Sequence, residues 1–107
     1  MLTPELNQQI KDIIGSYRVV LFMKGSPEAP ACGFSASAVA MLIDTDIYFE
    51  SFDVYTNEIV RQGLKEFSSW PTFPQLYIDN ELIGGIDILS EMQECGELEE
   101  LKKTKNL

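Results

Sequence analysis

Hydrophobic side chains recur at helical spacing near the start of the chain. Thr3 and Pro4 are typical of a helix start, because threonine caps helices and proline suits their first turn. The hydrophobic positions that share one helical face are Leu6, Ile10, Ile13 and Ile14. With Gly15 as its stop, this pattern predicts an amphipathic first helix.

Short apolar runs and a second helical pattern follow. The continuous run VVLFM (19–23) predicts a strand that is buried on both faces, and IYFESFDV (47–54) is strand-like. Between them we expect a loop over 24–31 and a helix that begins at Cys32 or Gly33 and ends near Asp44. Asn57 suits the cap of another helix, whose hydrophobic positions are 60, 64 and 67.

Two short strands and an interrupted helix complete the pattern. QLYID and ELIGG predict strands joined by a tight turn at Asp79-Asn80, since both turn residues tolerate positive φ. A last helix is expected to start near Asp87 and to break at Gly96. Its predicted apolar face comprises Ile88, Met92 and Cys95.

The order of these elements is α-β-α-β-α-β-β-α, with a short extra helix at the end. Helical crossovers early and a hairpin late predict a mixed sheet of about four strands with helices on both faces. This is an α/β, three-layer, thioredoxin-like architecture. No repeat or linker interrupts the sequence, so we expect residues 1–107 to form a single domain.

Composition excludes several kinds of site. The chain has no histidine, which excludes Ser-His or Cys-His catalysis and histidine-ligated metal sites within it. Its two cysteines cannot supply four thiolates to a metal. The net charge of −9 repels phosphate backbones, so no nucleic-acid partner is expected.

The first fifteen residues lack the features of a targeting segment. They have neither the long apolar region of a secretory signal nor the arginine content of a transit peptide. No stretch has the apolar length needed to span a membrane, so no membrane partner is expected. We therefore expect a cytoplasmic protein, or a mitochondrial one if a targeting segment has been removed.

Cys32 is the first candidate for chemistry. It stands at the predicted start of a helix, where free N–H groups and the helix dipole stabilise an anion. Lys24, at the end of the first strand, adds a positive charge near the sulfur. Both effects are expected to lower the pKa of the Cys32 thiol and to favour the reactive thiolate.

The segment WPTFPQLY (70–77) is the second candidate. In a thioredoxin-like fold the proline that enters this strand is commonly cis and faces the active cysteine, which points to Pro74. Phe73 then has free backbone groups that can pair with an extended ligand. An ordinary proline-rich connection is the alternative.

GGID (84–87) and Arg61 are the third candidate. Asp87 either caps a helix or holds a ligand's amino group beside the paired glycines. Arg61 lies beside the apolar stripe of its helix, where it is either a solvated charge or a group that binds a carboxylate.

In this order KGSPEAPACGFS, WPTFPQLY and GGIDI closely resemble the monothiol glutaredoxins with a CGFS active site. The resemblance runs from about Leu6 to Leu101 and implies that 1–107 is a single glutaredoxin domain. It implies that Cys32 is both the catalytic cysteine and a metal ligand, and that Trp70, Gly84 and Gly85 shape a groove. The residues that it implies for glutathione binding are Lys24, Cys32, Arg61, Phe73, Pro74, Ile86 and Asp87.

Ser35 stands where a second cysteine would resolve a mixed disulfide, so a two-cysteine cycle within the motif is impossible. By resemblance, two protomers each give the active cysteine and one glutathione thiol, which together make the four thiolates of a [2Fe-2S] cluster. The resemblance therefore implies a homodimer, when cluster-bound, that carries the cluster in iron–sulfur assembly and iron homeostasis. Its implied partners are BolA-family proteins and iron–sulfur apo-proteins.

Two other functions remain open. One is a glutathione-dependent oxidoreductase that acts through Cys32 on protein–glutathione mixed disulfides. The CGFS class is generally poor in such turnover, so we expect a weak enzyme at most. The other is an interaction module, since the family also occurs fused to thioredoxin-like domains.

Cys95 is predicted to be a buried, inert core thiol, because it shares helical spacing with Ile88 and Met92. Some members of the family carry a second cysteine directly after the paired glycines. Ile86 occupies that position here, so a resolving role is not assigned to Cys95.

Overall fold

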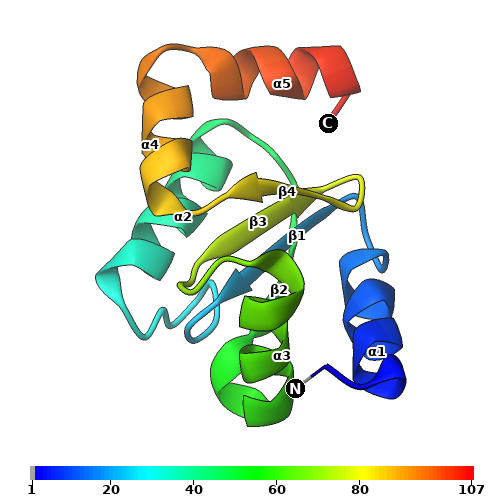
Figure 1. Ribbon diagram of the computed structural model, residues 1–107. Coiled ribbons are helices and arrows are strands. Elements are labelled where there is room, and N and C mark those ends of the chain that lie inside the picture. The colour runs from blue at the N-terminus through cyan, green and yellow to red at the C-terminus, as the bar shows by residue number, and fades with distance from the viewer. Residues whose placement is uncertain (1) are drawn as a thin grey trace.

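A four-stranded sheet in the order β2-β1-β3-β4 runs through the centre of the computed structural model, which describes residues 2–107 (Figure 1). β1 is parallel to β2 and antiparallel to β3, and β3 is antiparallel to β4. The strands are β1 (Val19–Met23), β2 (Glu50–Asp53), β3 (Gln75–Ile78) and β4 (Glu81–Gly84). The predicted mixed sheet is thereby confirmed.

Helices cover both faces of the sheet, as Figure 1 shows, so the three-layer architecture is confirmed as well. α1 and α3 pack together on one face, and α2 packs with α4 on the other. The helices are α1 (Pro4–Ile14), α2 (Gly33–Asp44), α3 (Glu58–Ser68), α4 (Ile86–Glu94) and α5 (Glu97–Lys105), with a short 3-10 helix η1 (Val54–Thr56).

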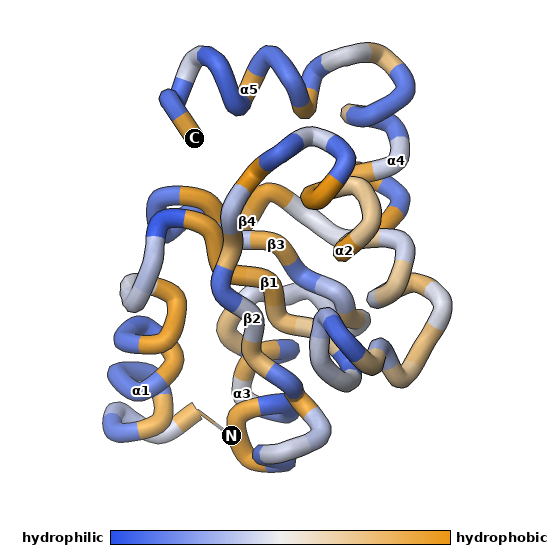
Figure 2. The backbone as a smooth tube through the Cα atoms, turned by 180° about the vertical axis from the view of Figure 1, so that it is seen from behind, coloured by the Kyte–Doolittle hydropathy of each residue, from blue (hydrophilic) through white to orange (hydrophobic). Residues whose placement is uncertain are grey.

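The alternation of side chains along β1 divides the core into two clusters. Val19, Leu21 and Met23 belong to the cluster under α2 and α4. Val20 and Phe22 belong to the cluster under α1 and α3. Figure 2 accordingly shows β1 as hydrophobic, whereas α1 alternates between hydrophobic and hydrophilic residues. β1 is buried along its whole length, as its continuous apolar run predicts.

The side-chain caps of two helices follow the sequence prediction. The Thr3 hydroxyl oxygen accepts a hydrogen bond from the Leu6 N–H at the start of α1. The Asn57 side chain accepts one from the Val60 N–H at the start of α3. The predicted turn at Asp79-Asn80 is also present, with φ values of 49° and 70°.

β2 is shorter than the predicted strand over 47–54. Its pairing with β1 begins at Glu50, opposite Val20. Ile47 is nevertheless buried, and Phe49 packs against the same cluster, from an extended segment that is outside the sheet. The apolar residues before Glu50, which suggested a longer strand, are therefore apolar because they pack on the core and not because they pair in the sheet.

α4 starts near Asp87 and a break at Gly96 separates it from α5, as predicted, but two details differ. The N-cap is Gly85, so Asp87 lies inside the first turn and the alternative in which its side chain caps the helix is wrong. The predicted burial of Cys95 is also wrong. The helix ends at Glu94, which makes Cys95 the C-cap. Cys95 is exposed rather than buried, and its thiol lies 3.7 Å from the Met92 carbonyl oxygen.

Within residues 2–107, no helix has both the length and the apolar character that a membrane span requires.

Candidate functional site

The register of the sheet brings the predicted site residues to one of its ends. Phe22 of β1 lies opposite Gln75 of β3, so the chain leaves β1 toward Lys24 beside the point where Pro74 enters β3. Gly84 lies opposite Leu76, so the start of α4 reaches the same end. Met23 lies opposite Asp53, which places η1 and the start of α3 there too.

Cys32 is the N-cap of α2. Its backbone is extended, with φ −153° and ψ 154°, and its sulfur accepts a hydrogen bond from the Ser35 N–H at 3.4 Å. The thiol therefore occupies the place of a capping side chain and faces the free N–H groups of the first helical turn. A hollow of about 450 Å³ beside it is lined by Cys32, Gly33, Phe34 and Ser37.

The buried Ser35 hydroxyl connects Cys32 to the end of β1. Its oxygen lies 3.4 Å from the Cys32 sulfur and accepts a hydrogen bond of 3.1 Å from the Lys24 N–H. The sequence interpretation treated Ser35 only as the replacement of a resolving cysteine and missed this role. A signal was present, since a residue three positions after an N-cap commonly contacts the capping side chain.

These contacts lower the pKa of the Cys32 thiol. Partial burial acts against ionisation, but hydrogen bonds from the Ser35 hydroxyl and from the N–H groups of Ser35 and Phe34 outweigh it. The positive charge of Lys24 acts in the same direction. The predicted direction of the shift is thus confirmed, and the hydrogen bonds contribute more to it than the charge.

The loop before Cys32 is closed by backbone contacts. Gly25, with φ 87°, has no room for a Cβ, which would lie 2.5 Å from the Ala29 carbonyl oxygen. Its N–H donates to the Asp53 carboxylate at 3.0 Å, and the Ala31 N–H donates to the Lys24 carbonyl at 2.8 Å. These contacts fix the position at which the loop joins the start of α2, and so they position Cys32.

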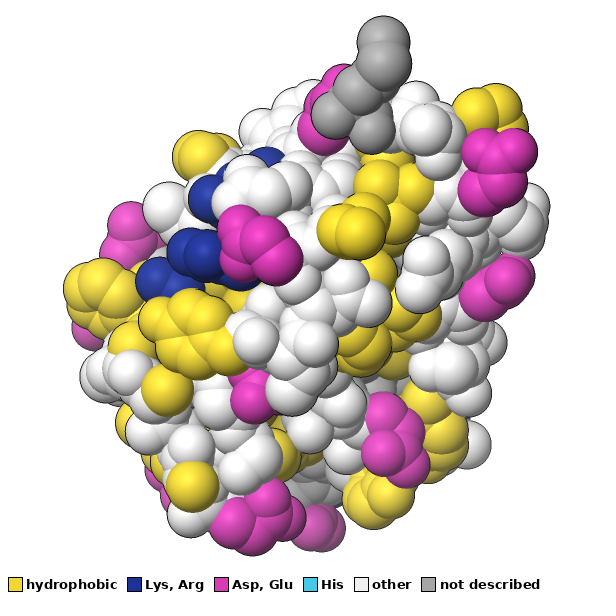
Figure 3. All heavy atoms as spheres, turned by 90° about the horizontal axis from the view of Figure 1, so that it is seen from below, with side chains coloured by type: hydrophobic (Ala, Val, Ile, Leu, Met, Phe, Trp, Pro, Cys, Tyr) yellow, Lys and Arg dark blue, Asp and Glu magenta, His cyan; other side chains and the backbone are white. Residues whose placement is uncertain are grey.

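Among the described residues, Arg61 on α3 has partners for some of its guanidinium N–H groups but not for all of them. Its Nη1 pairs with the Glu58 carboxylate at 3.2 Å, and its guanidinium lies 5.6 Å from the centre of the Tyr55 ring. Its Nε is buried and has no hydrogen-bond partner among residues 2–107. A buried N–H without a partner is costly, so this donor is well suited to an incoming carboxylate oxygen. In Figure 3, which looks at the end of the molecule that carries α1 and α3, basic side chains gather beside hydrophobic ones.

The turn before β3 lies against the paired glycines. The Phe73–Pro74 peptide bond is cis, as expected. A Cβ at Gly85 would lie 2.9 Å from the Trp70 ring nitrogen and 3.3 Å from the Pro74 carbonyl oxygen, so this glycine permits the close approach. Trp70, Pro74 and Gly85 are thus neighbours, and Ile86 and Asp87 follow directly in α4.

Gln75 holds this turn in place, and the sequence interpretation missed it. Its side chain is fully buried, and its Nε2 donates to the carbonyl oxygens of Trp70 at 2.9 Å and Thr72 at 3.2 Å. A buried amide at the start of an otherwise apolar strand was the available signal, because such a group requires partners.

No group of three or more cysteine and carboxylate side chains suitable for a metal ion occurs among residues 2–107, which also lack histidine. A metal cluster at Cys32 would need ligands from outside the chain.

Comparison with known proteins relates this arrangement to one family. The family description "Glutaredoxin" matches residues 19–83. Monothiol glutaredoxin-S7, chloroplastic, of Oryza sativa subsp. japonica is 54% identical over 99 residues, which are 92% of this chain and 59% of the relative. Glutaredoxin-3 of Homo sapiens is 49% identical over 98 residues, which are 92% of this chain and 29% of the relative. The chain thus spans less than two thirds of the length of these curated relatives.

Solved structures show the same likeness. A monomeric truncated mutant of Trypanosoma brucei 1-C-Grx1 superposes with a TM-score of 0.83 at 42% identity, covering 94% of this chain and 91% of that one. Reduced poplar apo GrxS14 superposes with a TM-score of 0.80 at 50% identity, covering 95% of this chain and 94% of that one. The thioredoxin-like fold is therefore shared over nearly the whole length.

Proposed function

The chain belongs to the glutaredoxin family, among its monothiol members, and from this premise we propose that it binds glutathione and carries a [2Fe-2S] cluster as a homodimer. The cluster is cargo in iron–sulfur assembly and iron homeostasis, and residues 1–107 act as one glutaredoxin domain in the cytoplasm. The observation that carries the proposal is the Cys32 thiol, which caps α2 with a lowered pKa and has a serine at the resolving position.

Two cations are assigned to the carboxylate groups of glutathione. The buried Nε of Arg61 lacks a partner among the described residues, and a carboxylate oxygen would satisfy it. Lys24 acts on Cys32 electrostatically and so lies close enough to attract an anionic ligand toward the sulfur. Lys24 directly follows β1, and Arg61 lies near the start of α3, which follows β2 and η1, so both are at the end of the sheet where Cys32 stands.

The remaining contacts are assigned to the cysteinyl and γ-glutamyl parts of glutathione. Phe73 precedes Pro74 and lies outside the paired residues of β3, so its backbone is assigned to the cysteinyl residue as an added strand would pair. Ile86 and Asp87 are at the start of α4, where the exposed Asp87 carboxylate is assigned to the amino group of the ligand.

The cargo requires four thiolates, and Cys32 is the one thiol that this chain offers at the site. The proposed set is Cys32, Cys32 of the partner subunit and the thiols of two glutathione molecules. Two of these ligands are exchangeable small molecules, which suits transfer of the cluster to iron–sulfur apo-proteins. A BolA-family protein is the proposed alternative partner in place of one protomer.

The test is anaerobic reconstitution with iron, sulfide and glutathione, followed by visible absorption and size measurement. Wild type and the matched control Cys95→Ser are expected to give a coloured dimer that requires glutathione, whereas Cys32→Ser stays colourless and monomeric. Colour that persists in Cys32→Ser, or a colourless wild type, would contradict the proposal.

The lowered pKa of Cys32 also favours a second function, the reduction of protein–glutathione mixed disulfides. The Cys32 thiolate attacks the glutathione sulfur, and the protein thiolate leaves and takes up a proton. A second glutathione thiolate then attacks the glutathione sulfur bound to Cys32, which releases glutathione disulfide and restores the Cys32 thiolate. Rapid deglutathionylation by a protein that forms no coloured dimer would favour this function over the first.

A further inference from the structure

Within residues 2–107, no strand pairs with the outer edge of β2. The strand order places β2 at one end, with β1 as its neighbour. Glu50 and Ser51 are exposed there. A strand at the edge of a sheet presents backbone N–H and C=O groups that can pair with another extended segment.

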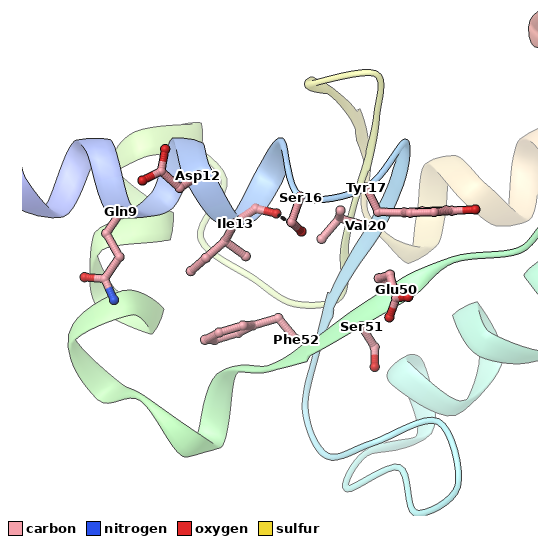
Figure 4. Close-up of a pocket in the computed structure, with 9 residues that line it drawn as sticks. All are labelled: Gln9, Asp12, Ile13, Ser16, Tyr17, Val20, Glu50, Ser51 and Phe52. Carbon is pink, nitrogen blue, oxygen red and sulfur yellow. Dashed lines mark hydrogen bonds between the residues drawn. The ribbon is translucent and has the colours of Figure 1, made fainter.

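A hollow flanks this edge on each face of the sheet. The first, of about 520 Å³, lies between α1 and β2, and its apolar lining includes Ile13 and Phe52 (Figure 4). The second, of about 610 Å³, lies on the α2 side, and its apolar lining includes Ile43 and Phe49. Glu50 and Ser51 line both hollows. The edge is thus bordered by hydrophobic surface on both faces.

Exposed aromatic side chains mark the end of this edge that is remote from Cys32. Tyr17, just before β1, is 41% exposed, and Tyr48, just before β2, is 62% exposed. Their ring centres are 5.2 Å apart, and the Tyr48 hydroxyl donates to the Glu50 carboxylate at 2.9 Å. Large apolar groups held in place at the surface are typical of a protein contact site.

The charged side chains that line the two hollows are all acidic. Acidic side chains line both hollows, and no lysine or arginine is among the described residues that line either one. One of the acidic groups, Asp46, pairs with Lys102 at 3.5 Å from outside the hollows. The acidic side chains in the two linings are Asp12, Glu28, Asp46 and Glu50.

We propose that the free edge of β2 binds an extended basic segment of a partner protein as an added strand. Successive side chains of an extended segment point to opposite faces, so they would enter the two hollows in turn. Basic residues of the segment would meet Glu50 and the other carboxylates. A second copy of this chain is disfavoured, because its own net charge is −9 and its Glu50 would face the same carboxylates.

The probe is a fluorescein-labelled decapeptide in which lysine alternates with valine, and the matched peptide has glutamate in place of lysine. We expect the basic peptide to bind the wild type and the acidic one not to bind, as measured by fluorescence anisotropy. Amide chemical shifts in the presence of the basic peptide should change along 47–53 and around Tyr17. Addition of glutathione should leave the binding unchanged, since neither hollow is lined by Cys32 or by another residue that is assigned to glutathione.

The variant Glu50→Lys should weaken binding of the basic peptide by about tenfold, because it replaces an attraction at the centre of the site with a repulsion. Glu91→Lys is the control, since it makes the same charge change on the exposed face of α4 and should bind within about twofold of the wild type. Tyr48→Ala should also weaken binding while circular dichroism remains that of the folded protein.

Equal loss of binding in both charge variants would overturn the proposal, because it would show attraction to the net charge alone. Shift changes confined to the Cys32 end of the sheet would also overturn it. Self-association of the free protein that Glu50→Lys alters would assign the edge to a second copy instead.

Discussion

The Ser35 hydroxyl serves two groups at once, because it accepts the Lys24 N–H and lies against the Cys32 sulfur. In Ser35→Ala the thiolate loses a hydrogen bond, so the pKa of the Cys32 thiol should rise. The expected measurement is the rate of Cys32 alkylation against pH in a Cys95→Ser background, whose midpoint should move to higher pH. The Lys24 N–H also loses its partner, which should lower the free energy of unfolding by about 1–2 kcal/mol.

Ser37→Ala is the matched control for this prediction, since Ser37 is exposed on the same helix and lines the hollow beside Cys32 but is not among the groups that shift the pKa of the thiol. Its alkylation profile should coincide with that of the parent. An unchanged profile in Ser35→Ala would mean that the backbone N–H groups and Lys24 alone are responsible for the lowered pKa of Cys32.

Arg61 pairs with Glu58, so a ligand carboxylate has to compete with the Glu58 carboxylate for the guanidinium. The Glu58 carboxylate accepts hydrogen bonds from Gln62 at 2.7 Å and from Arg61 at 3.2 Å, and these contacts lower its pKa. Glu58→Gln removes the competing charge and should tighten glutathione binding by about two- to fivefold, since exposed ion pairs are weak. Isothermal titration calorimetry measures this change. Weaker binding in Glu58→Gln would show that Glu58 orients Arg61 rather than competing for it.

At the scale of elements, the junction of β4 and α4 leaves no room for a side chain. Gly84 has φ 149°, and a Cβ there would lie 2.9 Å from the Ile88 Cβ. Gly84→Ala should therefore lower the free energy of unfolding by about 2–4 kcal/mol, as measured by urea denaturation.

Gly96→Ala shows how much of the loss comes from the positive φ alone, without a clash between the new side chain and its neighbours. Gly96, between α4 and α5, has φ 80° but nothing within 4 Å of its Cβ position. Its substitution should cost only about 1 kcal/mol, the penalty for the left-handed backbone. Similar losses in both variants would show that Ile88 moves aside and that the contact at Gly84 is harmless.

The helices were largely predictable because their ends carry local signals. Thr3 and Asn57 cap their helices by side-chain hydrogen bonds within three residues, which sequence alone reveals. The start of β2 was not predictable, because strand pairing depends on a partner, here β1, that is distant in sequence. Cys95 shares the helical spacing of Met92, but α4 ends before it, so the spacing no longer determines which way its side chain faces.

At the scale of the whole molecule, Arg18 ties the C-terminal helix to the sheet. Its guanidinium donates to the Asp79 carboxylate at 3.0 and 3.1 Å and to the carbonyl oxygens of Lys105 at 2.8 Å and Asn106 at 3.3 Å. Arg18→Ala should therefore speed amide hydrogen exchange in α5 and leave α1 unchanged. Arg18→Lys should be intermediate, since lysine keeps the charge but not the planar fork of donors.

The contact between Arg18 and Asp79 should weaken as the pH falls. Hydrogen bonds from Arg18 lower the pKa of Asp79 in the folded protein, so its contribution is present above the unfolded pKa and lost as the pH falls through the folded one. Protection of α5 should decline over that acidic range in the wild type. In Arg18→Ala the decline should be smaller but not absent, because Lys105 of α5 also pairs with the Asp79 carboxylate at 3.7 Å and lowers its pKa. A decline as large as that of the wild type would contradict the role given to Arg18.

The candidate site depends on the sheet in a way that motifs do not express. The residues of CGFS, WPTFP and GGID were identifiable from sequence because their spacing is distinctive. Their meeting at one end follows from the opposed directions of β1 and β3, where Phe22 lies opposite Gln75. The hydrogen bond from the Lys24 N–H to Ser35 could not be predicted, because it joins two separate elements. The Gln75 contacts are local, to the turn just before β3, and the buried amide was a signal that the sequence interpretation did not use.

Trp70 gives the protein a built-in optical probe. It is the chain's single tryptophan, so all indole emission comes from this one residue. Its ring nitrogen lies close to Gly85, where the turn before β3 meets the start of α4. Emission from this ring responds to changes in polarity and quenching beside it, so binding of the proposed glutathione ligand next to Trp70 can be followed in real time without a label. Trp70 lines neither hollow beside β2, so binding at that edge should leave the emission unchanged and the two surfaces can be titrated separately in one sample.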